Sequence, residues 1–130
     1  MATDPIRGWH ACVSAPTREA LDVLLADHVV FQSPAVHAPQ EGKTVTMRYL
    51  SAALEVLGGP SFRYVGEWRA ERSAVLEFEC VLEGGIQVNG VDMMEWDESG
   101  RITRFKVMIR PMKALNAVVA AMGAVLTRPE

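Results

Sequence analysis

The chain has 130 residues, of which 49% are hydrophobic and 22% charged, with a formal net charge of −3 at pH 7. This length and composition predict one globular domain over residues 1–130 and exclude extended disorder. The negative charge argues against a nucleic-acid partner, and no apolar run approaches the ~20 residues that a membrane-spanning helix needs. The first ten residues lack the basic and apolar regions of a secretory signal, so we expect a cytoplasmic location.

The residues that usually hold metals or phosphates are scattered. Cys12 and Cys80 are far apart and have no neighbouring ligands, so neither a disulfide framework nor a zinc site is predicted. The three histidines do not form a metal motif, and a glycine-rich phosphate loop is absent from the sequence. We therefore expect neither a metal nor a cofactor.

The N-terminal region is predicted to form two short helices. Asp4 is a suitable N-cap, Pro5 suits the first helical position, and apolar residues at helical spacing continue to about Ser14. Pro16 interrupts this pattern, and a second helix is predicted over residues 17–26.

A short strand and a long helix follow. The β-branched and aromatic residues at 29–33 predict the strand, and residues 35–42 are expected to form a loop. Apolar residues at helical spacing over 43–57 predict the longest helix, which residues 58–60, Gly-Gly-Pro, bring to an end.

The second half of the chain is predicted to be a four-strand antiparallel meander. Its strands are expected over residues 61–70, 73–82, 86–96 and 101–110, with alternation typical of a sheet that is covered on one face. Residues 97–100, Asp-Glu-Ser-Gly, predict a tight turn between the last two strands. A helix after Pro111 is apolar over a broad surface, which predicts either a dimer contact or a lid over a cavity.

One carboxylate stands out in this predicted sheet. Asp92 shares a strand face with Val88, Met94 and Trp96, all apolar, and its own strand carries no basic residue. Burial among these neighbours would raise the pKa of Asp92 and make it a candidate acid or base in a cavity. The alternative is a carboxylate that forms an ion pair with a basic neighbour.

A family resemblance rests on the order of the predicted elements and on three stretches of the sequence. They are LADHVVFQSP at 25–34, EGKTVTMRYL at 41–50 and VNGVDMMEWDESGRITRFKVMIRP at 88–111. The chain resembles the nuclear transport factor 2-like superfamily, which includes ketosteroid isomerases and SnoaL-like polyketide cyclases. The resemblance implies a cone-shaped α+β fold, in which a curved antiparallel sheet packs on the N-terminal helices and one long helix. The C-terminal helix is an addition to that core.

The resemblance to ketosteroid isomerases implies three site positions, and only one is retained. The family's general-base aspartate falls on Ser33, the tyrosine of its oxyanion hole falls on Trp9, and its second aspartate falls on Asp92. A serine does not exchange a proton near neutral pH as a carboxylate does, which argues against steroid isomerisation by the family mechanism. The SnoaL-like cyclases are compatible with a single aspartate.

The predicted function is a pocket for a small hydrophobic carbonyl compound, with isomerase, cyclase or lyase activity and Asp92 as its acid. The alternative is a non-catalytic ligand-binding or homodimerisation module with a vestigial pocket, and a homodimer is expected in either case. Structural roles also remain open for several lining residues, such as a core aromatic for Trp9 and a strand-end cap for Ser33. The predicted lining consists of Trp9, Phe31, Ser33, His37, Tyr49, Tyr64, Phe78 and Met94.

Overall fold

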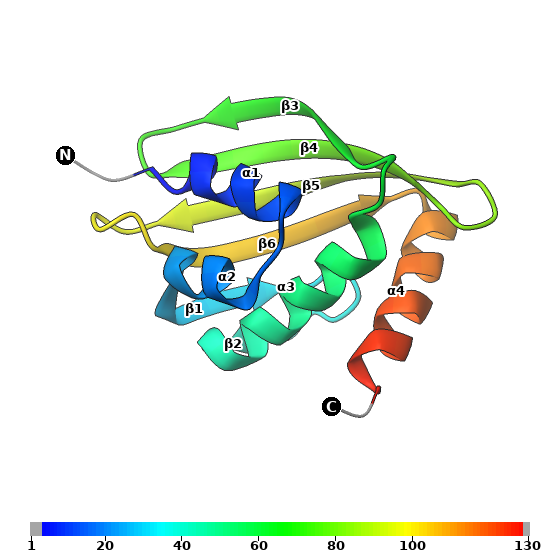
Figure 1. Ribbon diagram of the computed structural model, residues 1–130, viewed down its shortest axis with the longest axis horizontal. Coiled ribbons are helices and arrows are strands. Elements are labelled where there is room, and N and C mark those ends of the chain that lie inside the picture. Colours follow the sequence, from blue (N-terminus) through cyan, green and yellow to red (C-terminus); the bar gives the residue numbers. More distant parts are fainter. Residues whose placement is uncertain (1–3, 129–130) are drawn as a thin grey trace.

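A computed structural model describes residues 4–128 as four helices and six strands (Figure 1). The architecture is α+β, as predicted. The helices are α1 (Ile6–Ser14), α2 (Arg18–Leu24), α3 (Lys43–Leu57) and α4 (Met112–Leu126). The strands are β1 (Leu25–Gln32), β2 (Gln40–Glu41), β3 (Arg63–Arg69), β4 (Ser73–Leu82), β5 (Ile86–Trp96) and β6 (Ile102–Arg110).

All six strands belong to one curved sheet with the order β2-β1-β6-β5-β4-β3. The predicted antiparallel meander of β3 to β6 is confirmed. The sheet as a whole is mixed, because β1 pairs with β6 in parallel. The chain returns to β1 only after α3 and three further strands, and hydrophobic patterning does not specify the direction of such a long-range pair.

The largest boundary differences lie around β1. Helix α2 ends at Leu24, and β1 begins at Leu25, which pairs with Ile102 of β6, so β1 is longer than predicted and α2 is shorter. Strand β2 lies inside the predicted loop and pairs with β1 through two residues. Pairing with β6 outweighs the local helical pattern of residues 25–26, since tertiary context overrides weak propensity.

The helices cover one face of the sheet. Helices α1, α2 and α3 lie across its inner face, and α4 packs beside α3 at the end formed by β5 and β6 (Figure 1). Along β4, buried and partly exposed residues alternate as predicted. The core therefore lies between the inner face and the helices, and the opposite face of β3 to β6 is not covered by any helix among residues 4–128.

The turn after β5 has the predicted chemistry. The Asp97 carboxylate accepts hydrogen bonds from the backbone N–H groups of Ser99 and Arg101, at 3.0 and 3.1 Å. Gly100 has a φ of 85°, which a residue without a side chain adopts most readily. This turn sets the register between β5 and β6, and so determines which β5 side chains face the core.

Candidate functional site

Asp92 lies at the centre of the sheet with its side chain on the inner face. It pairs with Leu76 of β4 and Val107 of β6, and only 6% of its surface is exposed. Burial raises its pKa from 3.8 to about 7, and a hydrogen bond from Tyr64 opposes that rise. The predicted rise in the Asp92 pKa is therefore confirmed. No ion pair forms to Asp92 within residues 4–128, so the structure does not support the ion-pair alternative.

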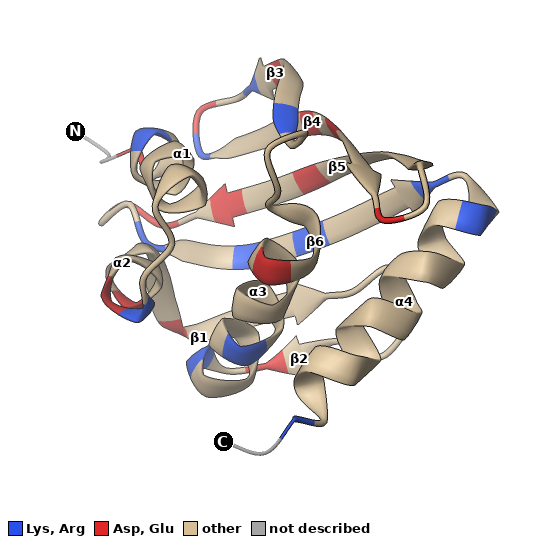
Figure 2. Cartoon of the chain, turned by 45° about the vertical axis from the view of Figure 1, so that its right-hand side comes forward, with Lys and Arg blue, Asp and Glu red and all other residues tan. Residues whose placement is uncertain are grey.

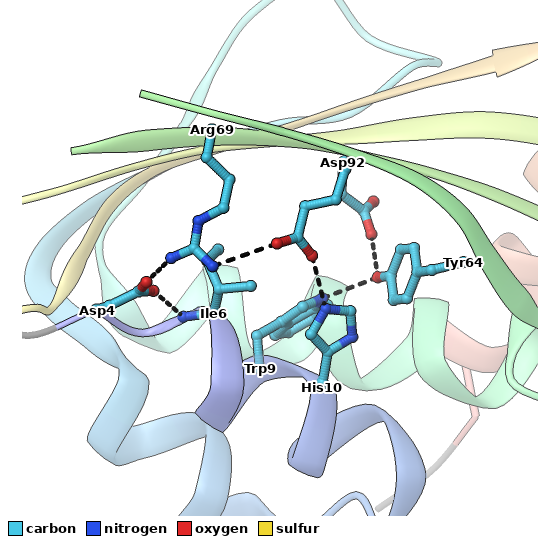
Figure 3. Close-up of polar contacts among 8 residues, drawn as sticks. Asp4, Ile6, Trp9, His10, Tyr64, Arg69 and Asp92 are labelled. Atoms are coloured by element: carbon cyan, nitrogen blue, oxygen red, sulfur yellow. Dashed lines mark hydrogen bonds and ion pairs between the residues drawn. The ribbon is translucent and has the colours of Figure 1, made fainter. Parts of the chain in front are cut away.

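A chain of two hydrogen bonds ends on the Asp92 carboxyl (Figure 3). The Trp9 indole N–H on α1 donates to the Tyr64 hydroxyl on β3 at 2.8 Å, and that hydroxyl donates to Asp92 Oδ2 at 2.5 Å. Burial raises the pKa of Tyr64, and the Asp92 charge raises it further, so Tyr64 stays a neutral donor. Within residues 4–128, no group donates to the other Asp92 oxygen, Oδ1.

A cavity of about 40 Å³ lies beside this hydrogen-bond chain, between α1, α3 and the inner face of the sheet. It has room for a few water molecules, and it is well below the ~300 Å³ of a typical drug-sized ligand site. Gly58, an exposed residue after α3, also lines it, so the cavity meets the surface at that end of α3. Its polar groups come from Trp9, Tyr64 and Asp92. The other lining residues are Val13, Leu50, Ala53, Leu54, Leu57, Phe62, Phe78, Phe105 and Val107.

Four of the nine predicted site residues meet at this cavity: Trp9, Tyr64, Phe78 and Asp92. Trp9 does not offer its N–H to the cavity directly, because Tyr64 accepts it. Phe78 packs its ring against Gly90, where an added Cβ would lie only 2.5 Å from the ring. The glycine therefore gives Phe78 the space to line the cavity beside Asp92.

The other five predicted residues do not line the cavity. Phe31 stacks on Tyr49 with ring centroids 5.6 Å apart, and Met94 is buried elsewhere in the core. The Ser33 hydroxyl accepts hydrogen bonds from the backbone N–H groups of residues 35 and 36, which is the capping role left open by the sequence. His37 is exposed in the loop after β1.

The largest share of the lining that the sequence prediction missed comes from α3. Leu50, Leu54 and Leu57 form the apolar stripe of that helix, so the helical period alone indicates that they face the core. Phe62 lies directly before β3 and two residues before Tyr64, so period-two alternation predicts that both face the same side. The hydrogen bond between Tyr64 and Asp92 joins two strands that are not neighbours, and no local pattern in the sequence indicates it.

A curved sheet around covering helices is the fold of the nuclear transport factor 2-like proteins, and in this chain a buried acid lies on the inner face of that sheet. The family model of the SnoaL-like domain matches residues 6–105. The chain therefore belongs to the SnoaL-like domain family. Helix α4 lies beyond the matched residues.

Solved structures agree with this family. A steroid delta-isomerase from Pseudomonas aeruginosa is 35% identical, with 93% of this chain and 88% of that chain covered and a TM-score of 0.87. A protein with a cystatin-like fold from Silicibacter pomeroyi is 28% identical, with 92% and 82% covered and a TM-score of 0.83. A putative polyketide cyclase from Sinorhizobium meliloti, 16% identical with 79% and 92% covered and a TM-score of 0.64, shares the fold. No curated protein sequence matches the chain.

Across residues 4–128, no helix is long and apolar enough to cross a membrane. The same residues contain no group of three or more His, Cys, Asp or Glu side chains placed to hold a metal ion. The ionisable groups that line the cavity are Tyr64 and Asp92.

Proposed function

We propose that the chain binds a small, mostly apolar carbonyl compound beside Asp92, and that Asp92 donates a proton to its carbonyl oxygen in a cofactor-free isomerase, cyclase or lyase reaction. One observation carries this proposal: a buried carboxyl without an ion-pair partner among the described residues faces an apolar cavity. Apolar pockets with a few converging polar groups are the usual form of small-molecule sites.

The pKa of Asp92 suits a proton transfer at neutral pH. With a pKa of about 7, the protonated and ionised forms are both well populated at pH 7. The protonated carboxyl can donate to a carbonyl oxygen, and transfer of that proton leaves a carboxylate on Asp92 and a protonated, positively charged carbonyl group on the ligand. This group becomes an enol when a carbon next to it loses a proton to a base. The Tyr64 hydroxyl then stabilises the carboxylate through its hydrogen bond to Oδ2.

The site holds one carboxylate where the ketosteroid isomerase pattern has two. Ser33, at the position of the general base, is engaged by the backbone and lies outside the cavity lining. A proton that leaves a ligand carbon would therefore pass to the Asp92 carboxylate formed in the first step, so that Asp92 would act first as acid and then as base. A site that binds a carbonyl compound without turnover is the second candidate, and the absence of another carboxylate from the described lining favours it.

Ligand size is limited by the cavity as it stands. An engineered apolar cavity that takes up benzene measures about 150 Å³, whereas this cavity measures about 40 Å³. A ring-sized ligand therefore requires side chains at the cavity to move. Leu57 and Phe62 are suited to this movement, because Leu57 directly precedes Gly58 and the Phe62 backbone N–H donates to the Gly59 carbonyl, which places both near the end of α3 where the cavity meets the surface.

The test compares cyclopent-2-enone with cyclopentene, a ring of the same size without the carbonyl group. Calorimetric titration at pH 6 should show tighter binding of the enone to the wild type. Asp92→Asn, which keeps a donor, should retain this preference, whereas Asp92→Leu should lose it. Turnover of a carbonyl substrate should vanish in both variants, because neither can transfer the proton. Equal affinity of the wild type for the two rings would contradict the proposal.

We also propose a homodimer that forms through the face of β3 to β6 that no helix among residues 4–128 covers. Basic residues lie along β6, and acidic residues lie along β4 and β5 (Figure 2). A two-fold axis that runs along β5 over this face would place Glu79 of one copy opposite Arg110 of the other, because both residues lie level with Asn89 of β5 and cyclic dimers use one surface twice. Analytical ultracentrifugation should give a dimer that Arg110→Glu weakens, and a monomeric wild type at high concentration would rule it out.

A further inference from the structure

We propose that His10, held by Glu67, is a positioning residue for Tyr64. The contact between His10 and Glu67, near the surface, would then orient the Tyr64 hydroxyl for its hydrogen bond to Asp92. The relevance to ligand binding rests on the proposed function, but the geometry of the contact does not. Three observations support the proposal: the weak backbone restraint on Tyr64, the bulge in its strand, and the contacts that α1 makes with it.

The backbone alone restrains Tyr64 weakly. Strand β3 is at the edge of the sheet and pairs, within residues 4–128, with β4 alone. The register between β3 and β4 also shifts between Tyr64 and Gly66. This irregularity directly follows Tyr64, whose side-chain direction determines the hydrogen bond to Asp92. Edge strands and bulges open more readily than paired strands, so the Tyr64 side chain depends on contacts outside the sheet.

The same bulge places two charged residues on the inner face with Tyr64. Opposed residues in an antiparallel pair project to the same side. Tyr64, Glu67 and Arg69 lie opposite Phe78, Leu76 and Ala74 of β4, and all three of those residues are buried on the inner face. Without the bulge, strict alternation would place residues 64, 66 and 68 on that face instead. The irregularity therefore brings Glu67 towards α1.

Two adjacent residues of α1 hold Tyr64 from different sides. The Trp9 indole donates to its hydroxyl, and the His10 ring meets its ring edge-on, with centroids 5.1 Å apart and an interplanar angle of 86°. His10 Nε2 lies 3.1 Å from Glu67 Oε1. A carboxylate can only accept, so this hydrogen bond requires the proton on Nε2, and it orients the imidazole ring.

Glu67 is itself held in place. Its second oxygen, Oε2, lies 3.2 Å from Arg69 Nη1, and Arg69 also forms an ion pair with Asp4. The other Asp4 oxygen accepts the backbone N–H of Ile6 at 2.8 Å, at the start of α1. These contacts are partly exposed and contribute little to stability individually. Their role is positional, because together they hold the first turns of α1 against the inner face of β3.

The position of the Tyr64 ring affects the pKa of Asp92. The Tyr64 hydrogen bond stabilises the Asp92 carboxylate and lowers its pKa against the effect of burial. If the Tyr64 ring turns away, that stabilisation is lost and the pKa of Asp92 rises. Loss of the negative Glu67 charge by itself would have the opposite effect, because a nearby anion favours the protonated acid. The sign of the shift therefore separates positioning from simple electrostatics.

The experiment is a carbon-13 NMR titration of the Asp92 carboxyl in the full chain without ligand. Tyr64→Phe should raise the Asp92 pKa by about one to two units, the value of a hydrogen bond to a charged group. Glu67→Ala should raise it by a smaller amount. Glu67→Gln keeps an acceptor for His10 Nε2 and should leave the pKa at or below that of the wild type. Glu79→Ala is the matched control, because it removes a 3.1 Å contact with Arg63 of β3 that does not involve Tyr64, and it should cause no change.

A lowered or unchanged Asp92 pKa in Glu67→Ala would overturn the proposal, as would equal rises in Glu67→Ala and Glu67→Gln. Because no ligand is present, these outcomes do not depend on whether a carbonyl compound binds. If Glu67→Ala raises the pKa and no carbonyl compound binds, then the positioning role stands and the proposed function fails.

Discussion

Replacing Asp92 by asparagine tests the energetic consequence of burying this carboxyl group. Its pKa is about 7 in the folded chain and 3.8 ordinarily. As the pH rises from about 4 to about 7, the unfolded chain releases this proton while the folded chain keeps it. The folded state then binds more protons than the unfolded state, so the free energy of unfolding falls with rising pH across this window. Above pH 7 the contribution is constant.

The size of the effect follows from the two pKa values. The gap between 3.8 and about 7, at about 1.36 kcal/mol per pKa unit, corresponds to a destabilisation of roughly 4 kcal/mol above pH 7. Water that reaches the cavity would reduce this value. The asparagine side chain of Asp92→Asn has no charge to bury, and its carbonyl oxygen can still accept from Tyr64. The variant should therefore match the wild type near pH 4 and exceed its stability by up to about 4 kcal/mol at pH 8.

Urea unfolding of both proteins from pH 4 to pH 8, followed by circular dichroism, measures this difference directly. Effects of the other ionisable groups cancel when the two pH profiles are subtracted. Glu95→Gln provides a control on the same strand, because the Glu95 side chain is 57% exposed. A difference between Asp92→Asn and the wild type that is the same at both ends of the pH range would refute the reasoning.

Two further predictions concern packing at the cavity. Leu57→Ala should destabilise the fold by about 3 kcal/mol in urea titrations and enlarge the cavity, so that cyclopentene, which should bind the wild type poorly, stabilises the variant. Absence of stabilisation by this ligand would show that the neighbouring side chains collapse into the space. Gly90→Ala should cost about 1 to 3 kcal/mol, because its Cβ would lie 2.5 Å from the Phe78 ring and 2.6 Å from the Met108 carbonyl oxygen. An unchanged unfolding midpoint would mean that Phe78 moves freely.

The sequence predicted the elements whose patterns are locally complete. The bounds of β4, β5 and α3 agree with the prediction, because long alternating or helical patterns end there at glycine-rich turns or at the Asp97 turn. The strand β2 and the parallel direction of β1 were missed. Both depend on pairing between segments that are distant in sequence, which local patterns do not encode.

The candidate site was predicted in part for the same reason. Asp92 follows from alternation along a regular strand, and its burial follows from its apolar neighbours. Glu67 and His10 could not be found in this way, because the bulge between Tyr64 and Gly66 reverses the alternation that the sequence implies. Ser33 was assigned by resemblance to ketosteroid isomerases and His37 by its place in the loop that follows, and the cavity is lined instead by residues of α1, α3 and β3 to β6.

The central claim is that protonated Asp92 donates a hydrogen bond to a carbonyl oxygen inside the cavity. Infrared difference spectroscopy of carbon-13-labelled cyclopent-2-enone, bound at pH 6, observes that hydrogen bond directly. The carbonyl stretch should move to lower frequency in the wild type than in an apolar solvent, and Asp92→Leu should remove most of this displacement. A bound carbonyl that absorbs at the same frequency in the wild type and in Asp92→Leu would contradict the account.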